Sequence, residues 1–433
     1  MTGFGAIAEL AVGEVRSPRP SVPSYLTPDQ FRLAADPDDT AAFGRLAAAV
    51  NAAGTGKVRL TRGYTVYSTV PAGALGYAPL MRFMHVNGLE IDCRGSIITN
   101  AYPFSLSSPD VAPLFLMQWC TDVEIHSPTG VQSTNIALPQ ANPIPGTQLI
   151  VPAGSNSGIL VTNPQMTGGQ ALFDCFVGTY VGLVPDEGIA LVNPRSYGAQ
   201  YGMVFAGSGL ASSVTGGYVQ GAERAIFIYD VGDIGFDVAA QDCLGAEWCL
   251  IGATLAPWVE NVRGRFTVLP RSAPSASGSD TYVNLEVHPV AGASIRDIEL
   301  DLHIDYANDT QSTMARAFSF TKATTGALGS LFSNIRIRGS IRNMPVSGGN
   351  AVEVFRPADA PWSGESAVGI VLGPFVFEGS DEPAFYCDLA PCKSVGQMMY
   401  RDVKFPGALS EVNAAPNARL SSNAVFAGAL ISP

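Results

Sequence analysis

Acidic side chains gather in one short stretch near the middle of the chain. Six carboxylates fall within 25 residues: Glu223, Asp230, Asp233, Asp237, Asp242 and Glu247. Cleavage of a glycosidic bond needs two carboxyl groups, about 5–5.5 Å apart for retention or about 6.5–9.5 Å for inversion. Neighbouring strands of a sheet lie about 4.8 Å apart, so carboxylates on successive strands reach this range. The candidate catalytic residues are Asp237, Asp242, Glu247 and Asp305.

Asp305 joins this set because it follows Asp237 by 68 residues, which is two periods of the repeat described below. Equal periods would stack the two carboxylates on one face, two coils apart. His303 lies beside Asp305 and is a candidate proton carrier, since histidine titrates near neutral pH. The alternative for all of these groups is a solvated surface or loop charge.

Aromatic residues cluster in the same part of the chain. Sugar rings stack on aromatic faces while their hydroxyl groups meet carboxylates and amides. The candidate substrate-binding residues are Tyr197, Tyr201, Tyr229 and Trp248. Aromatic side chains also fill ordinary cores, which is the competing interpretation.

The overall charge limits the classes of partner. The 433 residues carry a formal charge of −12, with 14% charged residues and no cluster of Lys and Arg. Such a chain is poorly suited to binding nucleic acid through its phosphates or to adhering to anionic membranes. The sequence contains no run of 18 apolar residues, so no membrane insertion is expected. Neutral or acidic glycans remain suitable partners.

The cysteines and the first residues indicate the compartment. Seven cysteines form no Cys-x-x-Cys pair, and with four histidines a structural zinc site is not expected. We therefore expect reduced, mostly buried thiols.

Glu9 and Glu14 interrupt the apolar N-terminal stretch, which lacks a basic start and does not resemble a secretory signal. No cofactor is predicted, although a calcium site built from carboxylates on different coils stays open.

A short unit that recurs along the chain must position these side chains. It consists of a turn residue followed by apolar, any and apolar residues. Its copies begin at Gly88, Asp122, Asn261, Asp297, Asn334 and Asp402. Adjacent copies lie 34, 36 and 37 residues apart, and the remaining gaps are close to multiples of this period. A fixed period of this length indicates stacked repeats.

Strand-rich repeats without intervening helices favour a parallel β-helix over a propeller, because the Asn-Gly and Asp-Gly signals of hairpins do not recur along the chain. One copy departs from the unit, with Gly264 at its second apolar position. The Asn and Asp residues before the strands suit the sharp turn between sheets, and their side chains can form a ladder along the stack. Val123 and Ile125, Ile298 and Leu300, and Ile335 and Ile337 are expected to share one core.

One helix is expected ahead of the strands. Asp39 or Thr40 can cap its N-terminus, and Gly54 can end it in a left-handed conformation. Phe43, Leu46 and Val50 recur at three- and four-residue spacing and form one apolar stripe.

The stretch from Asp38 to Val70 resembles the start of the pectate-lyase-like superfamily of right-handed β-helix proteins. The resemblance lies in Asp38-Asp39-Thr40, an Ala-rich helix, and then Gly56, Val58, Leu60, Gly63 and Tyr64, with Thr61 in place of the usual Pro. It implies that the helix covers the open N-terminal end of the coil. The start is common in bacteriophage tailspikes and in secreted polysaccharide lyases, hydrolases and epimerases.

The sharper catalytic signatures of the superfamily are absent from the sequence. There is no Asn-Thr-Asp, Asp-Asp and Gly-His-Gly set of polygalacturonase-like hydrolases, and no Tyr-Gly-Phe-Asp-Pro-His of alginate epimerases. Ile335-Arg336-Ile337-Arg338 is only superficially similar to a hydrolase Arg-x-Lys motif and fits an outward-facing strand edge. Whether the protein is an enzyme therefore stays open.

The expected fold is all-β, a right-handed parallel β-helix with an N-terminal capping helix. The expected segments are a virion-docking arm (1–30), the capping helix (31–56), the β-helix (57–405) and a C-terminal tail (406–433). The leading hypothesis is a homotrimeric bacteriophage fibre or spike, assembled in the host cytoplasm, that binds a bacterial surface polysaccharide. Whether it also depolymerises that polysaccharide stays open. The arm would contact other virion proteins. The alternatives are a free polysaccharide lyase or hydrolase and a purely structural decoration protein.

Overall fold

The computed structural model describes most of the chain between residues 25 and 343. The gaps are 70–78, 107–109, 135–145, 177–185, 207–210, 246, 254–257, 275–280, 288–292, 311–315 and 323–330. Beyond residue 343 it describes the backbone of short strands between 350 and 430. The docking-arm interpretation of residues 1–24 and the repeat copy at Asp402 lie outside the described residues.

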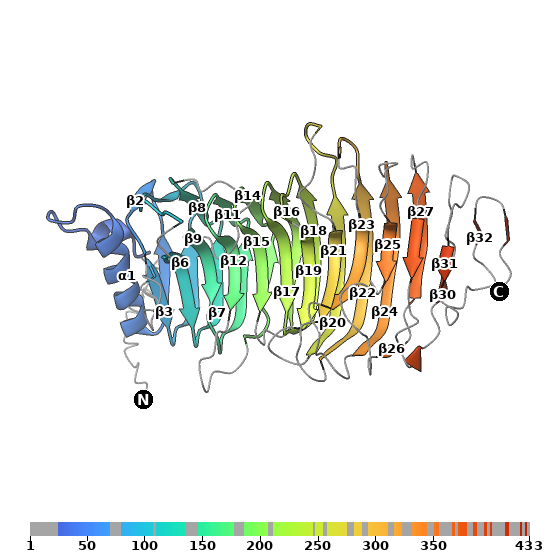
Figure 1. Cartoon of the computed structure of the whole chain (residues 1–433). Helices are drawn as coiled ribbons and strands as arrows, with labels where there is room; N and C mark the ends of the chain where they lie inside the picture. Colours follow the sequence, from blue (N-terminus) through green and yellow to red (C-terminus); the bar gives the residue numbers. More distant parts are fainter. Residues whose placement is uncertain are drawn as a thin grey trace, which may run out of the picture.

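The chain winds as a stack of coils, and each coil passes through two large sheets (Figure 1). The 19-stranded sheet contains β1 (Gly56–Arg59), β2 (Tyr64–Val66), β4 (Asn87–Asp92), β5 (Ile98–Asn100), β7 (Thr121–His126), β8 (Thr129–Gln132), β10 (Ser157–Thr162), β11 (Gln165–Thr167), β13 (Ala190–Val192), β14 (Arg195–Tyr197), β16 (Ser212–Gln220), β18 (Gly232–Gln241), β20 (Trp258–Val268), β22 (Ser294–Asp305), β24 (Leu331–Arg342), β26 (Ser366–Val368), β27 (Val371–Glu378), β29 (Ser394–Val395) and β30 (Met399–Tyr400).

The 12-stranded sheet contains β3 (Met81–Met84), β6 (Val111–Gln118), β9 (Gly146–Pro152), β12 (Ala171–Phe176), β15 (Tyr201–Ala206), β17 (Arg224–Tyr229), β19 (Glu247–Ala253), β21 (Thr281–Val287), β23 (Arg316–Lys322), β25 (Asn350–Val354), β28 (Ala384–Cys387) and β31 (Val412–Ala414). Every described pairing in the two large sheets is parallel, whereas β32 (Val425–Phe426) and β33 (Ala429–Leu430) pair antiparallel. The fold is a right-handed parallel β-helix, as the repeat period predicts.

The apolar positions of the repeat share one core. Val123 lies in register with Leu89 on the preceding coil and with Ile159 on the following one. Ile298 lies in register with Ile335 in the same way, and all five side chains are buried in a single cluster. The prediction of one shared core is therefore confirmed.

The residue before these strands adopts the left-handed conformation in coil after coil. Asn and Asp tolerate this conformation better than other non-glycine residues, which explains the composition of the turn. The residues in register at this corner are Gly88, Asp122, Gly158, Gly188, Ala211, Asp233, Asn261, Asp297 and Asn334. We call this row the turn column.

Helix α1 (Thr40–Ala53) closes the N-terminal end of the stack (Figure 1). Phe43, Leu46 and Val50 are fully buried in the core cluster, so the predicted stripe is confirmed. The helix ends at Gly54, which has φ 70°. Covering the first coil in this way protects apolar side chains that no further coil would bury.

Asp39 anchors the helix to the first coil. Its carboxylate accepts hydrogen bonds from Arg62 at 2.8 Å and from the backbone amide of Thr65 at 3.0 Å. Burial acts to raise the pKa of Asp39, but these bonds and the nearby guanidinium groups hold it below its ordinary value. The carboxylate thus stabilises the fold as an anion.

The coil architecture extends slightly beyond the predicted segment boundaries. Leu26 exchanges backbone hydrogen bonds with Lys57 and Arg59, and a short 3₁₀ helix, η1 (Pro28–Phe31), follows. The structured chain therefore includes the last residues of the predicted arm. At the other end β31 pairs with β28, although it lies within the predicted tail.

Two further sequence expectations concern thiols and membranes. Cys93, Cys120, Cys175, Cys243 and Cys249 are free and buried. Burial raises the pKa of Cys243 to about 12, so this thiol is unreactive. In the part of the chain that the structure describes, the helices are too short or too polar to cross a membrane.

Gly264 breaks the repeat because a neighbouring coil fills its place. Phe236 lies in register with Gly264, and a Cβ at Gly264 would come within 2.2 Å of the Phe236 ring. The ring occupies the space that the second apolar residue takes in other copies.

We expect Gly264→Val, which restores the repeat pattern, to destabilise the protein by about 1–3 kcal/mol through overpacking. The double variant Phe236→Ala/Gly264→Val should recover part of this loss, as measured by urea unfolding. Gly44→Ala, where a Cβ meets nothing within 4 Å, is the control and should stabilise by about 0.5–1 kcal/mol. A Gly264→Val protein as stable as the wild type would contradict this account.

Candidate functional site

The outward face of β18, β20, β22 and β24 carries charges in regular columns. Parallel pairing places Arg263, Glu299 and Arg336 in one column on successive coils. Signs alternate along it, which places attractive neighbours about 4.8 Å apart. We call this surface the lateral face.

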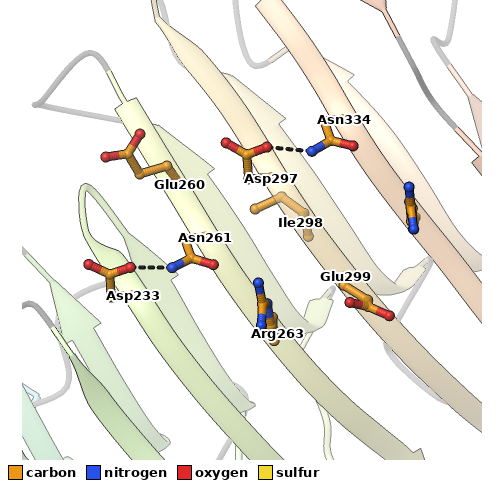
Figure 2. A pocket seen from close by; sticks show the side chains of 9 residues that line it. Asp233, Glu260, Asn261, Arg263, Asp297, Ile298, Glu299 and Asn334 are labelled. Atoms are coloured by element: carbon orange, nitrogen blue, oxygen red, sulfur yellow. Dashed lines mark hydrogen bonds between the residues drawn. The ribbon is translucent and has the colours of Figure 1, made fainter.

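A groove of about 530 Å³ lies where this face meets the turn column. Figure 2 shows its side chains rising from successive strands of the 19-stranded sheet. The groove is lined by Asp233, Glu260, Asn261, Arg263, Asp297, Ile298, Glu299, Asn334 and Arg336. It thus presents four carboxylates, two amides and two guanidinium groups.

Alternating Asp and Asn side chains form one wall of the groove. The Asn261 amide donates to the Asp233 carboxylate, and Asn334 Nδ2 donates to Asp297 Oδ1 at 2.5 Å. The amides separate carboxylates that would otherwise repel one another. The predicted side-chain ladder therefore exists, and it borders a cavity.

The groove offers hydrogen-bonding groups of the kinds that suit a polyhydroxylated chain. Carboxylates accept hydrogen bonds from hydroxyl groups, amides both donate and accept, and guanidinium groups donate. Arg263 and Arg336 can also pair with an acidic sugar in charge-assisted bonds.

The predicted stacking of Asp237 and Asp305 is wrong. Asp237 is in register with Arg265, which is in register with Asp301, whereas Asp305 lies four residues further along β22 and beside Arg342. The two coils differ in length, with 28 and 36 residues between partners, so counting equal periods gives the wrong residue.

The other two predicted carboxylates lie apart from the groove. Asp242 accepts hydrogen bonds from Ser272 at 3.0 Å and Gln220 at 3.3 Å. Partial burial acts to raise the pKa of Asp242, but these bonds hold it below its ordinary value.

Glu247 lies on β19, in the 12-stranded sheet, and pairs with Arg224 at 3.0 Å. Burial raises the pKa of Glu247, and the ion pair opposes that shift.

The structure does not gather the four predicted catalytic carboxylates into one site. Asp237 is on the lateral face, Asp305 is near the end of that face, Asp242 is at a turn and Glu247 is on the other sheet. Their assignment as catalytic residues stays a prediction.

The predicted tyrosines are half-buried and lie on both sheets. Tyr197, on β14, contacts Tyr218 with ring centroids 6.1 Å apart. Tyr201 and Tyr229 flank Phe227 on the 12-stranded sheet, and burial raises the pKa of both. None of the three lines the groove, and their binding role stays a prediction.

Trp248 cannot stack on a sugar in this structure, which corrects the sequence interpretation. Its side chain is fully buried, with its ring edge-on to Tyr282 at 4.6 Å and the Arg271 guanidinium 5.4 Å from the ring. It fills the core, as the competing interpretation of the aromatic cluster proposed.

The groove residues that the catalytic prediction missed belong to the turn column. Asn261, Asp297 and Asn334 were identified from the sequence as turn and ladder residues, and that role is correct. The repeat itself could have indicated these groove residues, because the polar residue before each strand recurs on the same edge of the 19-stranded sheet. Arg336 was likewise predicted on an outward-facing edge, where it now lines the groove.

No group of three or more His, Cys, Asp or Glu side chains within the described residues is arranged to hold a metal ion.

Known proteins resemble this chain in structure and not in sequence. No protein family and no curated protein matches it. The A-module of the mannuronan C-5 epimerase AlgE6 of Azotobacter vinelandii superposes with a TM-score of 0.47 at 13% identity, over 90% of this chain and 100% of the module.

Two further solved structures show a similar chain path. A tailspike protein of E. coli bacteriophage HK620 has a TM-score of 0.45 at 12% identity, over 93% of this chain and 78% of the tailspike. An exopolygalacturonase of Thermotoga maritima has a TM-score of 0.44 at 10% identity, over 94% of both chains. Such similarity concerns the fold alone. The fold itself, a right-handed parallel β-helix, rests on the strand register described above.

The turn-column ladder leads to a test of its electrostatics. We expect Asn261→Asp to place three carboxylates in a row and to destabilise the protein by about 1–2 kcal/mol at neutral pH, since each pair about 5 Å apart repels by almost 1 kcal/mol in water. Repulsion raises the folded-state pKa of these carboxyls above their unfolded values. The deficit should therefore be complete at neutral pH and disappear below about pH 4.

Thermal unfolding of wild type and variant at pH 7 and pH 4 measures this effect. Asn261→Gly is the control, because it keeps the left-handed turn and removes the amide without adding charge. A pH-independent difference between Asn261→Asp and wild type would rule out carboxylate repulsion as its cause.

Proposed function

We propose that this protein is a bacteriophage fibre or spike that binds a bacterial surface polysaccharide in the groove of the lateral face. The observation that carries the proposal is the groove itself, with its carboxylates, amides and guanidinium groups fixed on rigid strands. A long polar polymer can lie along such a face, because successive coils repeat the same binding groups at the strand spacing.

Rigidity supports binding of a flexible ligand. The lining side chains project from β-strands or from the turn column, so little freedom is lost when the ligand binds. The hydrogen bonds of Asn261 and Asn334 further orient the two aspartates. A preorganised surface of this kind favours specificity for the arrangement of hydroxyl groups on a glycan.

The partner class also follows from charge. With a formal charge of −12, the protein is not suited to nucleic acid, whereas Arg263 and Arg336 supply local positive groups for an acidic sugar. The five described cysteines are buried thiols, which supports assembly in a reducing cytoplasm, where virions are built.

Depolymerisation is the second candidate function. Glu260 and Asp297 line one groove from successive coils, and glycosidic cleavage uses two carboxyl groups. A free lyase or hydrolase would share this face. Release of oligosaccharides from a bound polysaccharide distinguishes cleavage from binding alone.

Glycan binding can be measured on an array of purified capsular and O-antigen polysaccharides. We expect Arg263→Ala and Glu299→Gln each to weaken binding of the recognised polysaccharide about tenfold or more, since a hydrogen bond to a charged group contributes about 1.5–3 kcal/mol. Both residues are on the surface, so thermal stability should change little.

Lys57→Ala is a matched control for the binding experiment. Lys57 starts the same outward column at the opposite end of the stack, where it pairs with Glu90. We expect it to leave binding unchanged. Equal losses in Lys57→Ala and Arg263→Ala, or no loss in either groove variant, would count against this groove as the binding site.

The virion hypothesis predicts an assembly state. A fibre or spike is expected to be a homotrimer, with three coils packed side by side. Light scattering on the purified chain should give about three times the monomer mass of 45.3 kDa. A stable monomer at micromolar concentration would favour the free enzyme.

A further inference from the structure

A carboxylate, an imidazole and a hydroxyl form a continuous row on the lateral face. His303 Nδ1 lies 3.0 Å from Ser340 Oγ, and His303 Nε2 lies 3.4 Å from Asp301 Oδ1. Asp301 and His303 are two residues apart on β22, and Ser340 is in register with His303 on β24. Nucleophile, base and orienting acid are thus in the order that activates a serine.

The partners of His303 determine which ring nitrogen carries the proton. An ionised carboxylate only accepts hydrogen bonds, so the tautomer that suits this row carries its proton on Nε2, which faces Asp301. Nδ1 is then the acceptor that faces the Ser340 hydroxyl. Arg265 lies 3.5 Å from the other oxygen of Asp301 and holds that carboxylate in place.

The row borders a second hollow that a substrate can enter. This hollow of about 280 Å³ includes His303, Ser340 and Arg342 in its lining. The His303 side chain is 41% exposed, so its ring is accessible. Arg342 follows Ser340 by two residues on the same face of the strand and can stabilise an oxyanion that forms at the serine.

The backbone before Ser340 is unusual for a strand. Gly339 has φ 145°, and a Cβ there would lie 1.7 Å from the carbonyl oxygen of Leu302. The pairing of β24 with β27 also shifts in register between Ile337 and Gly339. The extra residue of this shift lies on β27, and Ser340 stays in register with His303 on β22.

A similar row at the other end of the stack supplies a comparison. His126 Nδ1 lies 3.1 Å from Thr162 Oγ1, and His126 Nε2 lies 3.4 Å from Glu124. Parallel coils therefore generate this contact pattern readily. The second row has a secondary hydroxyl in place of a serine, and the residue before Thr162 is Val161 and not a glycine of positive φ.

We propose that Asp301, His303 and Ser340 form a serine esterase site that removes acyl groups from polysaccharide hydroxyls. The choice of an acylated polysaccharide rests on the proposed function, because the hollow and the glycan groove lie along the same strands, β20, β22 and β24. The ester chemistry rests on the row alone.

The reaction has two balanced halves. Ser340 Oγ attacks the acyl carbonyl carbon while His303 Nδ1 takes the hydroxyl proton, and Arg342 faces the oxyanion. The bond between the carbonyl carbon and the sugar oxygen then breaks, and His303 returns the proton to the leaving alcohol. Water attacks the acyl-serine with His303 as the base again, which releases a carboxylic acid and restores Ser340.

A fluorophosphonate probe tests the nucleophile directly. We expect it to label wild-type protein at Ser340, as located by peptide mass spectrometry, and not to label Ser340→Ala. Hydrolysis of 4-nitrophenyl acetate should fall about 100-fold or more in Ser340→Ala and in His303→Gln, since triad members contribute factors of about 10³–10⁶ elsewhere.

Asp301 acts through His303 and is a positioning residue. Asp301→Asn should lower kcat for the aryl ester by at least about tenfold with KM unchanged, because it alters the imidazole and not the hollow. Thr162→Ala, in the comparison row, is the matched control and should retain wild-type kcat. Circular dichroism and thermal melting establish that each variant is folded.

The proposal is overturned if folded wild-type protein is not labelled at Ser340, or if Ser340→Ala hydrolyses the aryl ester at the wild-type rate. It is also overturned if Thr162→Ala loses as much activity as Ser340→Ala. Failure of the glycan-binding proposal gives a different result. The protein would then bind no polysaccharide on the array, whereas it would still hydrolyse the aryl ester.

Discussion

Backbone hydrogen bonding between successive coils is the constraint on which the rest of the structure depends. It places each residue directly above a partner from the previous coil, about 4.8 Å away. Every surface feature is therefore a column: alternating charges, alternating Asp and Asn, and stacked apolar residues inside. A side chain acquires its chemistry from the residues above and below it more than from its neighbours in sequence.

The fold was predictable because its signal is repeated. An apolar pair that recurs on coil after coil needs no single copy to be perfect, and even the defective copy at Gly264 keeps its register. The even period of about 35 residues is wrong in the middle of the chain, because five coils of unequal length, not four equal ones, join Asp122 to Asn261. The helix was predictable for a local reason, since its cap and apolar stripe lie within one short segment. The fold prediction used a pattern repeated along the chain, and the helix prediction used residues within a single segment.

The site was less predictable because it depends on coil length. Asp237 and Asp305 looked like stacked partners only if both intervening coils were equal, and the loops make them 28 and 36 residues. The role of Trp248 was not readable either, because a tryptophan beside carboxylates looks the same in sequence whether it faces a ligand or the core. Three-dimensional register settles both questions. It also brings Ser340 to His303, 37 residues away in the chain.

Inward and outward residues alternate along each strand, so selection for folding acts on the inward positions and selection for binding acts on the outward positions. Substitutions at positions such as Ile298 and Ile335 change the packing of the core, whereas Arg263, Glu299 and Arg336 contribute little to it. Loops of different length leave the columns intact, as the unequal coils demonstrate. The lateral face can therefore diversify rapidly under evolutionary pressure while the scaffold beneath it is conserved by its own folding requirements.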